Sequence, residues 1–133
     1  MLVVDSSVWI DFFHDEANSA VEALASFLEE GEVRIVVPDL VLFEVLRGFR
    51  HERELRQAQQ LMHSFHIETA GGADLALAAV AHYRSLRSSG FTIRSPIDVL
   101  LGAFCIDRDY TLLHRDRDFD ALESLRGLKV WRH

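Results

Sequence analysis

Cysteine is almost absent from this chain of 133 residues, and Cys105 is the only one. A single cysteine excludes an intrachain disulfide and a metal site built from several thiolates. No apolar run approaches the length that a transmembrane helix needs, and the N-terminus carries no basic segment followed by a cleavage site. We therefore expect no membrane association and a cytoplasmic location.

Lysine is as rare as cysteine, with Lys129 its only instance, and the formal net charge is −7. An acidic chain is by itself a poor candidate for nucleic-acid binding, which usually requires a basic patch. Two features weaken that objection. Acids gathered around a divalent cation have their charge partly neutralised there, and arginine, which supplies the other basic residues, suits phosphate and carboxylate. Net charge therefore leaves a nucleic-acid partner open.

The length and the hydrophobic fraction of 49% suit one domain, residues 1–133, with a sizeable core. Short apolar runs predict strands at residues 2–4, 34–37, 66–68, 111–113 and 128–131. Periodic stretches between them predict helices that begin near Ser7, run from Asp15 or Asn18 to Gly31, and cover residues 40–49, 51–64 and 73–87, followed by one opened by Ser95 and Pro96. Residues 114–120 are expected to form a loop or a short helix. This alternation predicts an α/β fold with a mostly parallel sheet.

The chain is organised around its first predicted strand, which ends at Asp5. The apolar residues 2–4 indicate a buried parallel strand, and Ser6 or Ser7 is expected to cap the helix that follows. Asp5 then lies at the carboxyl end of a central strand, where open α/β sheets bind their ligands. A solvated acid is unusual at that place, so Asp5 is a candidate cation ligand.

Four further acids lie beside strongly apolar sequence: Glu44, Asp98, Asp116 and Asp118. Each has a structural alternative. Asp98 fits the acidic half of a capping box with Ser95, which is worth about 1 kcal/mol. Glu44, considered alone, is more readily an exposed helical residue, and Asp116 and Asp118 suit a solvated loop.

The combination of these acids is what favours a metal site. Close like-charged carboxylates repel by up to about 4 kcal/mol at an effective dielectric near 20. A converging cluster therefore requires a cation or shared protons. Oxygen ligands without cysteine or histidine in register favour Mg²⁺ or Mn²⁺, ions that suit phosphoester chemistry.

Four blocks carry a resemblance to a known family: residues 3–11 (VVDSSVWID), 42–48 (LFEVLRG), 97–103 (IDVLLGA) and 112–119 (LLHRDRDF). In this order and spacing they resemble the PIN-domain nucleases and, among them, the VapC-type toxins of bacterial toxin–antitoxin systems. The resemblance extends over essentially the whole chain. It implies a three-layer α/β/α domain around a mostly parallel sheet.

The resemblance also implies a metal-dependent endoribonuclease with Mg²⁺ or Mn²⁺ in an acidic pocket. Asp5 and Asp98 are the implied principal ligands, Glu44 and Asp116 complete the catalytic quartet, and Asp118 is auxiliary. The hydroxyl of Ser6 or Ser7 is a candidate to hold a coordinated water or the scissile phosphate, although helix capping is preferred. Arg115 departs from the pattern, because many relatives have asparagine there. It is expected either to pair with an acid or to contact RNA phosphate.

The implied partners are an RNA substrate, often tRNA or rRNA, and a VapB-type antitoxin. The antitoxin would lay an amphipathic segment along the helices of residues 39–64 and push a basic side chain into the acidic pocket. A homodimer is also implied. An arginine recurs every third residue at Arg47, Arg50, Arg53 and Arg56. This run fits a solvated helix face and a contact for RNA or antitoxin equally well.

The remaining candidates have simpler structural interpretations. No histidines are spaced for metal binding, so we expect surface or capping roles for all seven, with His114 notable beside Arg115 and Asp116. Cys105 is expected in the core. A catalytically silent PIN-like binding module and a Mg²⁺-dependent aspartyl phosphatase are the alternative functions. The phosphatase normally needs a second acid two residues after the first, where this chain has Ser7.

Overall fold

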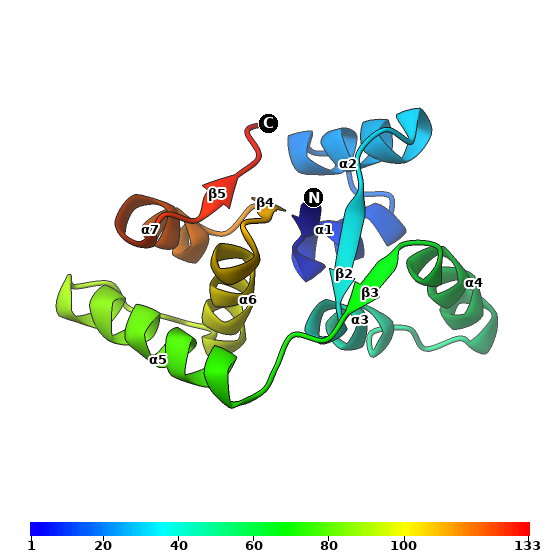
Figure 1. Ribbon diagram of the computed structural model, residues 1–133. Coiled ribbons are helices and arrows are strands. Elements are labelled where there is room, and N and C mark those ends of the chain that lie inside the picture. The colour runs from blue at the N-terminus through cyan, green and yellow to red at the C-terminus, as the bar shows by residue number, and fades with distance from the viewer.

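A five-stranded, fully parallel sheet forms the centre of the computed structural model, which describes residues 1–133 (Figure 1). The strand order is β3-β2-β1-β4-β5, and each pair of neighbours runs in the same direction. The strands are β1 (Leu2–Val4), β2 (Ile35–Pro38), β3 (His66–Glu68), β4 (Thr111–Leu113) and β5 (Lys129–Val130). The predicted α/β fold is confirmed, and the sheet is entirely rather than mostly parallel.

Seven helices pack on the sheet in two groups that lie on opposite sides of it (Figure 1). One group contains α1 (Ser6–Phe13), α2 (Ser19–Glu30), α3 (Asp39–Leu46) and α4 (Glu52–His63). The other contains α5 (Ala73–Ser88), α6 (Pro96–Arg108) and α7 (Arg117–Arg126). None of these helices combines the length and the apolar character needed to cross a membrane.

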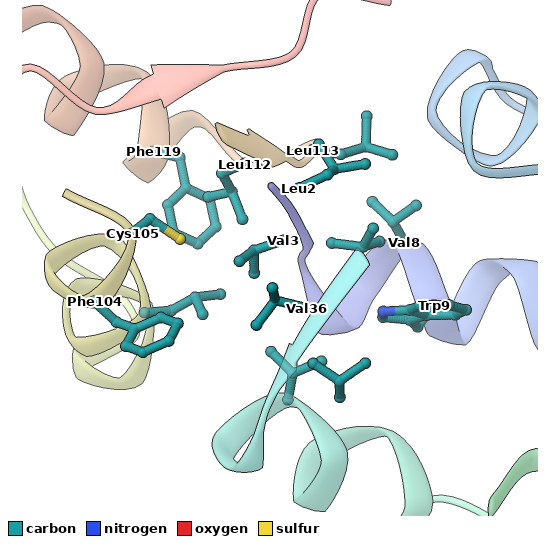
Figure 2. Packing of buried hydrophobic residues seen from close by; sticks show 14 of the residues in the cluster. Leu2, Val3, Val8, Trp9, Val36, Phe104, Cys105, Leu112, Leu113 and Phe119 are labelled. Atoms are coloured by element: carbon teal, nitrogen blue, oxygen red, sulfur yellow. The ribbon is translucent and has the colours of Figure 1, made fainter. Parts of the chain in front are cut away.

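Apolar side chains fill both spaces between the sheet and its helices. Phe104 and Cys105 of α6 and Phe119 of α7 lie on one side of the strands, and Val8 and Trp9 of α1 on the other (Figure 2). The strands β1 and β2 are buried on both faces, as expected for the centre of a parallel sheet covered by two helical layers, whereas the edge strands β3 and β5 are partly exposed. Cys105 is fully buried, which confirms its expected place in the core.

Three helix boundaries differ from the sequence predictions. The N-cap of α1 is Asp5 rather than Ser6 or Ser7, because the Asp5 carboxylate accepts the backbone N–H of Ser7. The predicted helix of residues 40–49 is α3, which begins one residue earlier at Asp39 and ends at Leu46. Its N-cap is Pro38, and Asp39 Oδ1 accepts the N–H groups of Leu40 and Ala70. Residues 114–120 are predicted to form a loop or a short helix. In the structure, α7 begins within this segment at Arg117 and continues to Arg126.

Candidate metal-binding site

The strand order creates a place where acids can gather at the carboxyl edge of the sheet. After β1 the chain builds β2 and β3 on one side, and it later returns to place β4 on the other side of β1. Parallel sheets bind ligands at such a switch point, between the carboxyl ends of the two strands where the order reverses. The backbone N–H of Asp5 donates to the carbonyl of Leu113 at 2.9 Å, so the ends of β1 and β4 are directly joined there.

Asp5 lies at this switch point and is 4% exposed. Its Oδ2 accepts hydrogen bonds from the Ser7 hydroxyl at 2.5 Å and from the Ser7 N–H at 3.3 Å. Its Oδ1 is buried without a hydrogen-bond partner. An unpaired buried carboxylate oxygen is costly. Asp5 thus caps α1 through Oδ2 and leaves Oδ1 without a partner, available to a cation.

Glu44 reaches the same edge of the sheet from α3, which begins directly after β2. Its Oε1 accepts a hydrogen bond from the Ser6 hydroxyl at 3.2 Å. The side chain is half-buried, so the expectation that Glu44 by itself would be exposed is wrong. Ser6 therefore links the start of α1 to Glu44, a contact that the sequence pattern did not indicate.

Asp98, Asp116 and Asp118 form the tightest group of acids in the molecule. One carboxylate oxygen from each lies within 4.8 Å of the others. Asp98 comes from the first turn of α6, whereas Asp116 is the N-cap of α7 and accepts the N–H of Asp118 at 3.0 Å. Asp118, expected to be auxiliary, is thus a full member of this trio, and Asp5 and Glu44 lie beside it rather than in it.

The capping-box alternative for Asp98 does not hold. Ser95 is the N-cap of α6, as predicted, but it makes no side-chain cap hydrogen bond. Asp98 instead experiences the negative charges of Asp5, Glu44, Asp116 and Asp118. All five acids singled out from the sequence therefore face one region.

Burial and crowding raise the pKa of two of these acids. The pKa of Asp5 rises to about 6, mainly because burial disfavours its charge and with a smaller push from Glu44, against the lowering effect of the Ser7 hydrogen bonds. The pKa of Asp98 rises to about 7, first through burial and then through the surrounding carboxylates. Without a counter-charge, these two groups hold protons close to neutral pH.

The donor set fits a hard divalent cation. It consists of carboxylate oxygens, one of them buried and unpartnered, and Cys105 lies in the core with the pKa of its thiol raised by burial. Oxygen ligands from several carboxylates are the environment that Mg²⁺ and Mn²⁺ prefer. A cation there would also relieve the repulsion that raises the pKa of Asp98.

Two arginines border the acidic site. Arg94 lies 3.8 Å from Asp116 Oδ1, and its backbone N–H donates to Asp118 at 3.4 Å. No sequence pattern indicates Arg94 as a site residue, although its place just before the Ser95–Pro96 helix start puts it near Asp98. Arg115 pairs with Asp11 at 2.7 Å, the first of the two roles expected for it.

Two histidines contradict the expectation that all seven have surface or capping roles. His82 and His114 are both buried, and burial lowers the pKa of each ring. His82 Nδ1 accepts a hydrogen bond from Arg126 Nε at 2.9 Å, away from the acids. His114 Nδ1 accepts the N–H of Asp116 at 3.1 Å and so contacts the site directly.

The raised pKa values predict a pH-dependent stability of the metal-free protein. Asp5 and Asp98 bind protons more tightly in the folded chain than at the ordinary value of 3.8. Their contribution to the free energy of unfolding is full at low pH and is lost as pH rises through about 6 to 7. In EDTA, the thermal midpoint should therefore fall between pH 6 and pH 8.

The matched comparison is D98N, which keeps every other titrating group. It is needed because the lowered pKa values of His82 and His114 make stability rise with pH at the acid end of the range, opposite to the effect of the two acids. Thermal melts of both proteins at the two pH values measure the difference. The fall should be smaller in D98N and should shrink in the wild type when Mg²⁺ is added. An equal fall in both proteins would contradict the assignment of this pH dependence to Asp98.

Comparisons with known proteins agree with this architecture. Ribonuclease VapC11 of Mycobacterium tuberculosis is 27% identical over 130 residues, which are 98% of this chain and 97% of the relative. The VapBC2 complex of Rickettsia felis, solved with a DNA fragment from its promoter, has a TM-score of 0.74 at 14% identity and 98% coverage of both chains. VapC20 of Mycobacterium tuberculosis, a toxin that cleaves the sarcin-ricin loop, has a TM-score of 0.66 at 18% identity, with 91% of this chain and 94% of that chain covered. The family model of the PIN domain matches residues 2–125, and the chain belongs to that family.

Proposed function

We propose that this chain is a VapC-type endoribonuclease toxin whose acidic site binds Mg²⁺ or Mn²⁺ and hydrolyses RNA phosphodiester bonds. The observation that carries the proposal is the gathering of five carboxylates at the switch point of the sheet, three of them with oxygens within 4.8 Å of one another. Membership of the PIN domain family and the similarity to Ribonuclease VapC11 support RNA as the substrate. Specificity for tRNA or rRNA is part of the same proposal.

In this mechanism Asp98, Asp116 and Asp118, together with the unpartnered oxygen of Asp5, would hold the cation. When bound, Mg²⁺ or Mn²⁺ polarises a phosphoryl oxygen and lowers the pKa of water. Glu44, oriented by its hydrogen bond from Ser6, or Asp116 accepts the proton of the attacking water. Cleavage leaves a 5′-phosphate on one product and a 3′-hydroxyl on the other.

Arg94 has a supporting role in this scheme. Its guanidinium approaches Asp116, and its main-chain N–H binds Asp118, so it helps to place two of the acids. The side chain is also exposed at the edge of the site. An arginine there suits the phosphate groups that flank the cleaved bond.

The test is degradation of RNA by the purified chain with Mg²⁺ or Mn²⁺, compared with the same reaction in EDTA. We expect cleavage only with the metal, with 5′-phosphate ends on the products. A catalytically silent binding module leaves the RNA intact, and an aspartyl phosphatase releases inorganic phosphate from monoesters. Either result would contradict the proposal.

The proposal includes inhibition by a VapB-type antitoxin. A hollow of about 750 Å³ lies between the end of α1 and the α4 region and combines apolar and charged walls, with lining residues that include Phe13, Phe49, Arg50, Glu54 and Leu61. Phe43, on the outer face of α3, is 68% exposed. Apolar side chains bordered by charges suit an amphipathic segment, as predicted for the helices of residues 39–64. The solved VapBC complexes with the same fold support this choice of partner. The homodimer stays a prediction.

A further inference from the structure

The imidazole of His114 is buried at the junction between β4 and the turn that leads into α7. The residue is 5% exposed, and its ring lies 4.9 Å from the ring of Phe119, centroid to centroid. Its carbonyl oxygen interacts with Nε2 of His133 at 2.9 Å, which ties the end of β4 to the C-terminal segment. The contacts with Phe119 and His133 therefore fix His114 independently of any contact with the acids of the site.

The inward contact of the ring is a single hydrogen bond to the acidic turn. Nδ1 accepts the backbone N–H of Asp116 at 3.1 Å, two residues further along the chain. Since Nδ1 is the acceptor, the ring proton of the neutral imidazole lies on Nε2. The next link follows at once, because Asp116 Oδ1 accepts the N–H of Asp118 at 3.0 Å.

These two bonds form one continuous series from His114 through Asp116 to Asp118. Asp116 and Asp118 are two of the three acids whose carboxylate oxygens lie within 4.8 Å of one another. The third, Asp98, comes from a different helix. Without the acceptor on His114, the N–H of Asp116 would lose its partner in a partly buried place, which is unfavourable. The turn would then be free to adopt other conformations that separate Asp116 and Asp118 from Asp98.

We propose that His114 is a positioning residue, whose Nδ1 fixes the turn that presents Asp116 and Asp118 to Asp98 for binding a divalent cation. The inference rests on the proposed function and adds a residue to it. What the site requires from His114 is a hydrogen-bond acceptor at the place of Nδ1, neither a charge nor a transferred proton.

The geometry separates this role from general base catalysis. Nε2, the second ring nitrogen, is fully buried and has no hydrogen-bond partner. Its nearest acid is Asp120, at 3.8 Å, which is not one of the five acids of the site. A base must lie within hydrogen-bonding reach of the proton that it removes, so the ring acts through Asp116.

The experiment compares two amides at position 114 that differ only in where their oxygen lies. In H114N, the side-chain oxygen takes the place of Nδ1 and accepts the N–H two residues on, a common asparagine turn. In H114Q, the oxygen lies one bond further out, near the place of Nε2. Titration of each purified protein with Mn²⁺, followed by electron paramagnetic resonance, gives the affinity without any use of RNA.

We expect H114N to bind Mn²⁺ nearly as tightly as the wild type and H114Q to bind it about 10- to 100-fold more weakly, the loss that partners of metal ligands typically cause. H82Q is the matched control, because it removes a second buried Nδ1 acceptor far from the acids. Its Mn²⁺ affinity should stay at the wild-type value. Thermal melts establish that each variant is folded.

Three results would overturn the inference: wild-type affinity in H114Q, equal losses in H114N and H114Q, or an equal loss in H82Q. The proposed function is separable from it. If the wild type binds Mn²⁺ and H114Q does not, while neither cleaves RNA, the nuclease proposal fails and the positioning role of His114 stands. A wild type that binds no Mn²⁺ contradicts both.

Discussion

Replacement of Asp98 with asparagine is expected to abolish RNA cleavage and to stabilise the metal-free fold at the same time. Asp98 is the acid with the most like-charged neighbours, and its pKa is raised to about 7. Removing its charge takes away a proposed ligand of the cation and relieves repulsion in the cluster. The loss of activity should exceed the 10- to 100-fold that is typical of an outer partner of a metal ligand. The thermal midpoint in EDTA at pH 8 should rise by on the order of 3 °C.

The two opposite changes distinguish a functional acid from a structural one. A structural acid loses stability and activity together when it is replaced, whereas Asp98 should lose activity while gaining stability. D107N is a suitable control, because Asp107 is an exposed acid on the same helix and outside the cluster. Cleavage should be unchanged in D107N. A lower midpoint for D98N in EDTA would contradict the interpretation.

Asp5 needs a different substitution, because it caps α1 and is also a proposed metal ligand. D5A would remove both the ligand and the N-cap of α1, and the loss of a cap costs about 1 kcal/mol. Asparagine keeps an oxygen that can accept the N–H of Ser7 while it removes the charge. D5N should therefore abolish cleavage with little loss of stability.

The fold was largely predictable because its strands are short apolar runs bounded by clear breaks. The sequence predicts strands at residues 2–4 and 111–113, and their alternation with helices predicts the parallel sheet. The segment after β4 was harder, because the sequence of α7 is polar at most positions and has few apolar residues to show a period. Its buried members, Phe119, Ala121 and Leu122, form a narrow stripe that a loop with charged residues can imitate.

The site was predictable as a set of acids but not in its internal geometry. Four of the five carboxylates follow a strand or lie at the start of a helix at the same edge of the sheet, and topology brings such positions together. Glu44 is the exception, because it lies inside α3. The sequence does not decide which of Asp5, Ser6 and Ser7 caps the helix, since aspartate and serine both cap helices well. His114 accepts the backbone N–H of Asp116, and the backbone N–H of Arg94 donates to the Asp118 carboxylate. Hydrogen bonds of this kind, with a backbone N–H as the donor, leave no pattern in the sequence. The sequence alone does not show whether an isolated histidine is buried or exposed.

Gly102 controls how closely α6 approaches α7, and valine at this position is expected to cause the largest loss of stability. A Cβ atom on Gly102 would lie 2.5 Å from Cδ1 of Leu122, which is 1% exposed and has little room to move. Inserting side-chain atoms into a packed contact of this kind costs as much as about 3 kcal/mol. Urea denaturation of G102V gives the loss directly.

The same contact also connects stability to the site. Asp98 belongs to α6, whereas Asp116 and Asp118 begin α7, so the separation of the two helices determines how closely the trio can approach. G102V should therefore weaken Mn²⁺ binding as well as the fold. The loss in G102V/L122A should be smaller than the sum of the two single losses, because the smaller residue at 122 removes the clash. G48A is the control for the glycine substitution, since a Cβ there meets only the Val45 carbonyl at 3.6 Å. Additive losses in G102V and L122A would show that the two helices do not meet at this point.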